Sequence, residues 1–477
     1  MRISIQQKEI IIKKHFVKLA AIVLAVLMVA SAFACSAVNN NPRIGKIGDV
    51  KIYYDMYSNA LSNYYYYIQQ GTIDGETAHE MIKKQLINYG VTLNKIHELG
   101  LEAQLTDEEK AQIAEDVQSS LDSALSSYKV DESITDEDEI YNAKLEQLKA
   151  ALKKNGTSFK DYMADLEESA TENFLFNKLR EMEDAKVTLT DEEAEAYFNE
   201  QAPKDAESYD NEHVSDFYTA YSNYIAGNGI IPFFIPDDVF LVKHLLIKYT
   251  TKDDTSKKEH PEVPKDGLDG EYGVFDKDAK ANIDAIVAEL EKGITFEEFL
   301  DLIDQYGEDP GVQSEITEGD DQRAEGAYHD TGYVMHEDLS KKWAEEFYYA
   351  SMKLYKGEDW EPAVDEDEDK DDKDSDADSE EEPKTYDITY YELTDGKKIA
   401  RVETTNGVHF IVINETLTPG QINYSEHADN IKEFRLKELQ DEHYTKTVEE
   451  WTKETKVNMR DKYIDQIAVA LGLISAK

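Results

Sequence analysis

Two histidines occupy matching positions in two stretches that have the composition of β-strands. His244 lies within FLVKHLLIKY (residues 240–249), and His409 lies within NGVHFIVI (residues 406–413), just after a turn-like Asn-Gly pair. A single histidine in a strand is most often a core residue whose ring nitrogens are satisfied. Two histidines, each placed one step into a strand-like run, indicate a shared role, although each remains open to the ordinary core interpretation.

The chain between the two histidines has the pattern of a compact α+β unit. Apolar residues at helical spacing predict two helices, of which the second opens at a capping box formed by Thr295 and Glu298. After the break YGEDPG (306–311), HDTGYV (329–334) predicts a turn and a short strand, and LSKKWAEEFYYASMKL predicts a third helix. The order strand, helix, helix, strand, helix, strand is that of an α+β fold, and we place this domain at residues 238–417.

The chain on either side of this domain is mainly helical. In residues 43–200, IGKIGDVKIYY (44–54) predicts a small hairpin, and two TDEE capping boxes, at 106–109 and 190–193, open helices. Residues 418–477 carry apolar side chains at mostly helical spacing. They predict a long amphipathic helix followed by a shorter apolar one.

Two segments have compositions unlike the rest of the chain. Residues 201–237 are rich in tyrosine and asparagine and end in IPFFIPDD, so we interpret them as a linker, with an added embellishment of the domain as the alternative. The acidic run DEDEDKDDKDSDADSEEE (365–382) cannot bury enough surface to offset its chain entropy, and we expect the whole insertion 363–385 to be disordered. Its acids do not follow the calcium-loop pattern, because no glycine stands at the sixth position.

The N-terminus has the layout of a secretory signal. Basic residues precede LAAIVLAVLMVASAFA (19–34), an uncharged run that ends in small residues. Cys35 follows directly and is the only cysteine, so no disulfide can form within the chain. This arrangement resembles a bacterial lipoprotein signal, in which residues 1–34 are removed, Cys35 is lipidated and residues 35–42 form a tether. An uncleaved anchor is the alternative, but the apolar run is short for a membrane span.

The formal net charge of −50 restricts the partners of the chain. So acidic a surface repels nucleic acid and anionic lipid headgroups, and it attracts basic or unfolded clients only weakly once salt screens it. The sequence contains no HExxH motif and no serine nucleophile elbow, and it lacks the long alternating βα pattern of solute-binding proteins. These observations speak against a nucleic-acid-binding protein, a protease, a metalloenzyme or a solute receptor.

The order of these segments resembles that of a known family of extracytoplasmic foldases. Residues 43–200 resemble the N-terminal helical domain of SurA- and PrsA-type foldases, which holds unfolded clients. Four stretches of the next domain resemble a parvulin-type peptidyl-prolyl isomerase, in order: VKHLLIKY, GITFEEFLDLIDQYGEDPG, WAEEFYYASMKLYKGE and TNGVHFIVI. The resemblance implies an α+β protein in which an all-helical lobe, completed by the C-terminal helix, carries an inserted domain with a small antiparallel sheet surrounded by helices.

The resemblance also implies which residues form the site. Asp309 falls where the family has Cys or Asp, and Trp343 stands where methionine is usual, which would narrow the pocket for proline. The expected catalytic residues are His244, Asp309 and His409, and the expected pocket for the substrate proline consists of Trp343, Phe347 and Met352.

The activity implied by the resemblance is peptidyl-prolyl cis–trans isomerisation in exported proteins, at the outer face of the cell membrane. Rotation about an X–Pro bond breaks no covalent bond, so no cofactor and no metal are expected. The expected partners are unfolded or partly folded exported proteins with X–Pro bonds, and the membrane through the lipid on Cys35; nucleic acid is not expected, and a homodimer is left open. The alternative is a client-holding chaperone with a degenerate, inactive parvulin-like domain.

Overall fold

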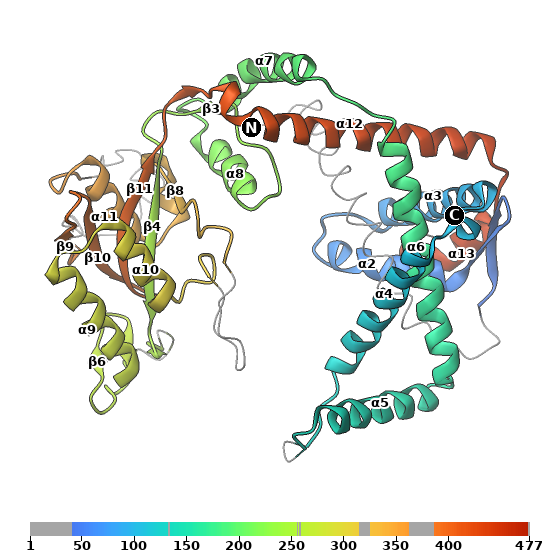
Figure 1. The fold of residues 1–477 in the computed structure, drawn as a ribbon, viewed down its shortest axis with the longest axis horizontal. Helices are drawn as coiled ribbons and strands as arrows, with labels where there is room; N and C mark the ends of the chain where they lie inside the picture. The colour runs from blue at the N-terminus through green and yellow to red at the C-terminus, as the bar shows by residue number, and fades with distance from the viewer. Residues whose placement is uncertain are drawn as a thin grey trace. The chain divides into compact units, whose positions relative to one another are not determined.

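The computed structural model describes residues 41–131, 134–254, 256, 259–313, 325–361 and 386–475 (Figure 1). The expected signal 1–34, the expected lipidation site Cys35 and the acidic insertion 363–385 lie outside the described residues. The chain divides into two compact units: unit 1 comprises Met1–Thr188 and Leu436–Lys477, and unit 2 comprises Leu189–Arg435. Helices and small antiparallel sheets occur in both units, which is compatible with the expected α+β class. No helix in the described part of the chain is both long and apolar enough to cross a membrane.

Unit 1 consists of helices around a three-stranded sheet, so this lobe is not all-helical. The hairpin of β1 (Arg43–Ile47) and β2 (Val50–Tyr53) pairs with β13 (Val457–Met459) in the antiparallel order β13-β1-β2. The helices of unit 1 are α2 (Tyr54–Gln69), α3 (Gly75–Leu99), the short η2 (Glu102–Gln104), α4 (Asp107–Ser126), α5 (Glu137–Lys154), α6 (Phe159–Asp184), the C-terminal part of α12 (Tyr424–Glu454) and α13 (Asp461–Ala470).

The C-terminal segment of the chain is part of the core of unit 1. Trp451 of α12 and Ile464 of α13 belong to the same buried cluster as side chains of β1 and α3. His79 of α3 also joins these parts, because its Nδ1 lies 2.7 Å from the Tyr57 hydroxyl and its Nε2 lies 3.1 Å from a carboxylate oxygen of Asp465. The two ends of the chain therefore build one core together.

Local signals in the sequence determine several helix ends. Thr106, Thr190 and Thr295 each cap a helix, and the glutamate three residues later returns a hydrogen bond, so the predicted capping boxes form. These bonds satisfy backbone N–H groups that the first turn of a helix leaves without partners. Helix α3 ends at Gly100, which takes the left-handed conformation with φ at 62°.

Unit 2 is built on a five-stranded antiparallel sheet in the order β8-β4-β11-β10-β9. Its strands are β4 (Phe240–Lys248), β8 (Tyr333–Met335), β9 (Thr389–Glu392), β10 (Lys398–Thr404) and β11 (Gly407–Thr416). The helices packed against it are α9 (Lys277–Lys292), α10 (Phe296–Tyr306), the short η3 (Glu337–Lys342) and α11 (Glu345–Lys356). Smaller sheets form from β5 (Thr251–Lys252), β7 (Gly273–Phe275) and β6 (Leu268–Asp269), and from β3 (Phe234–Ile235) and β12 (Gly420–Gln421).

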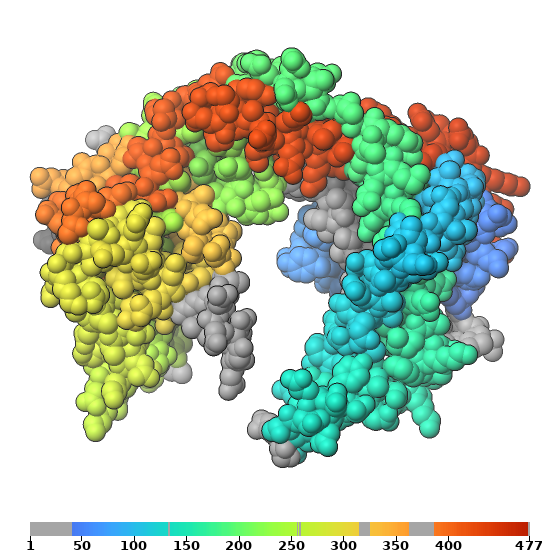
Figure 2. Space-filling view, in the orientation of Figure 1, coloured from blue at the N-terminus to red at the C-terminus, as the bar shows by residue number. Residues whose placement is uncertain are grey.

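Successive residues of strand β4 face opposite sides of the five-stranded sheet. Leu245 and Ile247 pack with α9 and α10, whose side chains form the yellow surface in Figure 2. Val242 packs on the other side, in a cluster with α11 and with Ile411 of β11. Because His244 is directly opposite Ile411 in the ladder, its ring also lies on the α11 side.

Residues 201–237 are folded, in contrast to the expected linker. Helix α7 (Asp191–Ser208) extends into this segment, α8 (Val214–Ile225) follows, and β3 pairs with β12 near the start of α12. Val214, Phe217 and Tyr221 of α8 are buried and recur at helical spacing. The tyrosines and prolines of this segment favoured a linker, although the apolar spacing within α8 is that of a helix.

Gly407 at the start of β11 allows the close approach of β11 to β4. Its φ is 146°, and a Cβ atom at this position would lie 2.0 Å from the carbonyl oxygen of Ile247. We expect Gly407→Ala to lower the free energy of unfolding of unit 2 by about 1–3 kcal/mol more than Gly396→Ala does. Gly396 is a matched control, since its φ is also positive, at 90°, but nothing lies within 4 Å of its added Cβ.

The measurement is urea unfolding followed by tryptophan fluorescence in a Trp451→Phe background. The remaining tryptophans, Trp343 and Trp360, belong to unit 2, so the signal reports this unit alone. Equal losses in the two glycine variants would contradict the predicted contact with β4.

Candidate active site

The pairing of β4 with β11 brings His244 and His409 together. His244 is opposite Ile411 and His409 is opposite Leu246, so the two histidines are diagonal neighbours on one face of the sheet. Their rings stack with centroids 5.0 Å apart, and the two Nδ1 atoms lie 2.9 Å apart. Both residues are 5% exposed, so the pair is almost completely shielded from solvent.

Asp309 reaches the pair from the turn that follows α10. One oxygen, Oδ2, lies 2.6 Å from Nε2 of His244 and also accepts a hydrogen bond from the Tyr333 hydroxyl at 2.7 Å. The other, Oδ1, accepts the backbone N–H of Gly311 at 2.9 Å. The carboxylate is thus held by three donors from three separate parts of unit 2.

The hydrogen bonds of this site form one chain with a single direction. An ionised Asp309 only accepts, so Nε2 of His244 carries a hydrogen. When both imidazoles are neutral, His409 donates from Nδ1 to Nδ1 of His244, and the Thr404 hydroxyl, 3.0 Å away, donates to Nε2 of His409. Each hydrogen bond of the chain is then donated in the direction of Asp309: from Thr404 to His409, from His409 to His244, and from His244 to Asp309.

The protonation of the site follows from burial and from these bonds. Burial raises the pKa of Asp309, but the hydrogen bonds from His244, Tyr333 and Gly311 outweigh it and hold the pKa well below its usual range. Burial, together with repulsion from His244 when that ring is charged, lowers the pKa of His409 well below its ordinary value. The site therefore holds an ionised carboxylate and a neutral His409 at neutral pH.

Aromatic rings cover the histidine pair on the α11 side. The Phe347 ring centroid lies 5.0 Å from that of His244 and 5.2 Å from that of His409, in edge contacts. Trp343 lies 5.9 Å from Phe347 and 5.4 Å from Tyr333. Phe347 is only 4% exposed, so Trp343 and its neighbours close over most of this ring.

Met352, the third expected pocket residue, stays a prediction. It belongs to the same buried cluster as Phe347, but it follows Phe347 by five residues on α11. A separation of five residues turns a side chain by about 140° around a helix. Met352 is 1% exposed and packs inside the core.

Three residues of the site were missed by the sequence analysis. Tyr333 and Thr404 complete the hydrogen-bond chain, and Tyr218 of α8 packs its ring 6.0 Å from Trp343. Tyr333 stands in the predicted strand HDTGYV and Thr404 precedes the Asn-Gly turn, so both lay in segments whose strands were expected. Only the spacing within α8 could have shown Tyr218.

The neutral, buried state of His409 predicts a dependence of stability on pH. The pKa of His409 is lower in the folded than in the unfolded chain, so the unfolded chain gains a proton below about pH 6.5 that the folded chain does not take up. This part of the stability is complete above about pH 6.5 and is lost as the pH falls further, by up to about 1.4 kcal/mol per pH unit.

The measurement compares urea unfolding of the wild type and of His409→Gln between about pH 7 and pH 5. This window lies above the usual pKa of aspartate, so Asp309 stays ionised in both states. The free energy of unfolding should fall more steeply with decreasing pH in the wild type than in His409→Gln. Parallel pH profiles would show that His409 is not held neutral by burial.

Comparisons with known proteins leave the family of this chain undetermined. No protein-family model matches it, and no curated protein matches it. Among solved structures, it is similar to the crystal structure of PrsA from Bacillus subtilis, with 13% sequence identity over 87% of this chain and 92% of that chain. The TM-score of this alignment is 0.25.

Proposed function

We propose that this chain is an extracytoplasmic foldase whose unit 2 catalyses cis–trans isomerisation of X–Pro bonds. The observation that carries the proposal is the meeting of His244, Asp309, His409 and Phe347, which come from four different elements. A polar network beneath an aromatic cover suits a reaction in which the amide is twisted and no covalent bond breaks. The proposed lipid on Cys35 would hold the protein at the outer face of the cell membrane.

The geometry supports a mechanism based on shape and charge. The planar X–Pro amide is stabilised by resonance that places negative charge on its carbonyl oxygen, and rotation faces a barrier of about 18–20 kcal/mol. A carboxylate beside that oxygen disfavours the planar form more than the twisted one. In the proposed complex Asp309 is the carboxylate beside the carbonyl oxygen, and its hydrogen bonds with His244 and Tyr333 keep it ionised and in position. Phe347 and Trp343 contact the proline ring. Tighter binding of the twisted amide then supplies the acceleration.

Unit 1 has surface features that suit a client-holding lobe. Tyr65, Tyr66 and Tyr67 near the end of α2 are 60%, 66% and 42% exposed. Aromatic side chains in solvent offer contact area to unfolded segments at low entropy cost. We propose that unit 1 binds unfolded exported proteins with X–Pro bonds.

The experiment that tests the proposed activity measures exchange between the cis and trans forms of a short X–Pro peptide by NMR. The protein is the full chain from residue 36, which lacks the signal and Cys35. We expect exchange well above the uncatalysed rate, which corresponds to tens of seconds. An Asp309→Asn preparation, purified identically, excludes a contaminating host isomerase. No acceleration by a folded wild-type chain would contradict the isomerase proposal.

A second candidate function is a client-holding chaperone without isomerase activity. The observation that favours it is the position of Trp343, which packs against Phe347, Tyr333 and Tyr218 and leaves little of Phe347 exposed. A closed pocket would still allow unit 1 to bind clients.

Trp343→Met distinguishes the two candidate functions. If Trp343 only narrows an active pocket, the smaller side chain should raise kcat/KM for X–Pro peptides by roughly tenfold, since one or two methylenes at a pocket wall have effects of this size. The NMR exchange assay on wild type and variant measures this change. Absence of activity in both, combined with suppression of aggregation of a proline-free client, would favour the chaperone without catalysis.

A further inference from the structure

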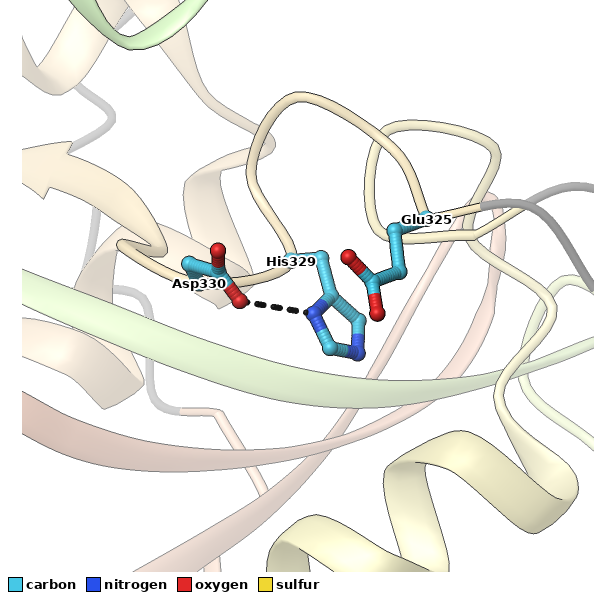
Figure 3. A group of neighbouring side chains, drawn as sticks. All are labelled: Glu325, His329 and Asp330. Carbon is cyan, nitrogen blue, oxygen red and sulfur yellow. Dashed lines mark hydrogen bonds and ion pairs between the residues drawn. The ribbon is translucent and has the colours of Figure 1, made fainter.

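A second group of titratable side chains lies beside the candidate active site, in the turn that leads to β8. Glu325, His329 and Asp330 each offer a ligand atom, and these atoms all lie within 4.8 Å of one another. Figure 3 shows the imidazole of His329 between the carboxylates of Glu325 and Asp330. Asp304 of α10 adds a further carboxylate, whose Oδ1 lies 3.0 Å from Nε2 of His329. We call these four residues the His329 cluster.

The two nitrogens of His329 have different surroundings. Nδ1 lies 3.0 Å from Asp330, on the side of the ligand group, whereas Nε2 faces Asp304 from another element. Histidines that bind metals usually donate their second ring N–H to a carboxylate, which orients the ring. Asp304 can accept such a hydrogen bond from Nε2 of His329, which orients the ring and leaves Nδ1 as the atom that would bind an ion.

The negative charge of the His329 cluster is only partly balanced by basic side chains among the described residues. Asp304, Glu325 and Asp330 can carry three negative charges, against at most one on His329. Among the described residues, none of these carboxylates forms an ion pair with a lysine or an arginine. Lys243 lines the adjoining cavity, where the charges of Asp304 and Asp330 act on its half-buried ammonium, but it forms no ion pair with any described residue. A bound cation would reduce the mutual repulsion of the carboxylates.

Space for an ion and its waters is present next to the cluster. A cavity of about 200 Å³ is lined by Asp304, His329 and Asp330 and, on its apolar side, by Leu300 and Ile303. One water takes up about 30 Å³, so this cavity holds an ion together with several water ligands. The side chains of Asp304 and Asp330 are 55% and 87% exposed, which leaves the site open to ions from solution.

We propose that the His329 cluster binds a divalent transition-metal ion, with Zn²⁺ preferred over Mn²⁺. Nδ1 of His329 and the carboxylates of Glu325 and Asp330 are the ligands, waters in the cavity complete the shell, and Asp304 orients the imidazole. A nitrogen ligand among carboxylates favours Zn²⁺ over Ca²⁺, which takes oxygen ligands. Zinc–ligand bonds are about 2.0–2.2 Å long, so ligand atoms spread over 4.8 Å converge with small rotations of exposed side chains.

The site would also hold the turn that carries Tyr333. Tyr328 lies directly before His329 and stacks on Tyr333, with centroids 4.4 Å apart, and Tyr333 donates to Asp309. An ion on His329 and Asp330 would therefore restrain the chain on both sides of this stacked pair. Metal binding itself does not depend on the proposed isomerase function.

A matched control exists elsewhere in unit 2. His260 also lies between two carboxylates, with Nδ1 2.6 Å from Asp253 and Nε2 2.8 Å from Asp269. Among the described residues it has no further carboxylate close enough to complete a ligand group. His260→Gln therefore changes the same type of side chain in a similar ion-paired setting without removing the proposed site.

The test is isothermal titration calorimetry of the chelator-treated full chain from residue 36 with ZnCl₂, MnCl₂ and CaCl₂. We expect one saturable Zn²⁺ site that is tighter than the Mn²⁺ site, in line with the general order of metal affinities. Glu325→Gln and His329→Gln should each weaken Zn²⁺ binding by at least about tenfold, and Asp304→Asn by about 10- to 100-fold. His260→Gln should leave the Kd for Zn²⁺ unchanged. Because this variant keeps the acidic insertion, it also retains any weak binding of Zn²⁺ to those residues.

Two results would overturn the proposal. One is the absence of a saturable Zn²⁺ site in the wild type, and the other is an unchanged Kd in Glu325→Gln. Glu325 is exposed, so its substitution does not disturb the core and this variant decides the question even if His329→Gln folds poorly.

Discussion

Asp309→Asn is expected to lower kcat/KM for X–Pro isomerisation by about 100-fold while unit 2 stays folded. The asparagine side chain keeps an oxygen that accepts from Nε2 of His244 and from the Tyr333 hydroxyl, and it loses the acceptor of the Gly311 N–H, so two of the three hydrogen bonds are retained. The variant loses the negative charge of Asp309, which is largely buried and is stabilised by the hydrogen bonds from His244 and Tyr333. Removal of one preorganised electrostatic group from an active site typically costs about 10²–10³ in rate.

The measurement is the NMR exchange assay with the full chain from residue 36, together with circular dichroism to show that the variant is folded. Asp284→Asn, on the exposed side of α9, makes the same chemical change away from the site and should leave the rate unchanged. Tyr333→Phe removes one donor to Asp309 and should give an intermediate loss. Wild-type activity in Asp309→Asn would rule out an electrostatic role of this carboxylate.

The parts of this site that could be predicted are those for which local sequence determines the side-chain direction. The strands around His244 and His409 are short runs of β-branched and apolar residues, and the Asn-Gly turn sets where β11 starts. Once the two strands pair, the period of two places both histidines on one face. Phe347 was expected at the site from the resemblance to parvulins alone, since every residue of α11 from Glu346 to Met352 is buried and burial does not single it out.

The residues that were missed depend on long-range pairing that no local pattern encodes. Thr404 meets His409 only because β10 pairs with β11 in a register that places Thr404 opposite Gly407. Tyr333 reaches Asp309 because β8 adds to the free edge of β4, although the two segments are far apart in the sequence. Tyr218 lies in a helix that composition alone suggested was a linker.

The division of unit 1 between the two ends of the chain leads to the second large effect. Ile464→Ala is expected to destabilise unit 1 by about 2–5 kcal/mol while the stability of unit 2 is unchanged. Ile464 of α13 is fully buried in the same cluster as β1, and the strand β13 just before it pairs with β1. Truncation to alanine leaves a cavity in the place where the C-terminal segment joins the N-terminal hairpin.

A loss of this size is a large share of the stability of a domain, which is typically about 5–15 kcal/mol. Urea unfolding in a Trp343→Phe, Trp360→Phe background makes Trp451 the only tryptophan, and its fluorescence then reports unit 1 alone. Tyr463→Ala is the matched control, because this neighbour on α13 is 38% exposed and should cost much less. If Ile464→Ala and Tyr463→Ala had equal effects, the C-terminal helix would not be part of the core of unit 1. A loss confined to unit 1 would instead mean that the stability of this unit depends on the contact between two segments far apart in the sequence, whereas the strands and helices of the proposed isomerase site all lie within one continuous segment.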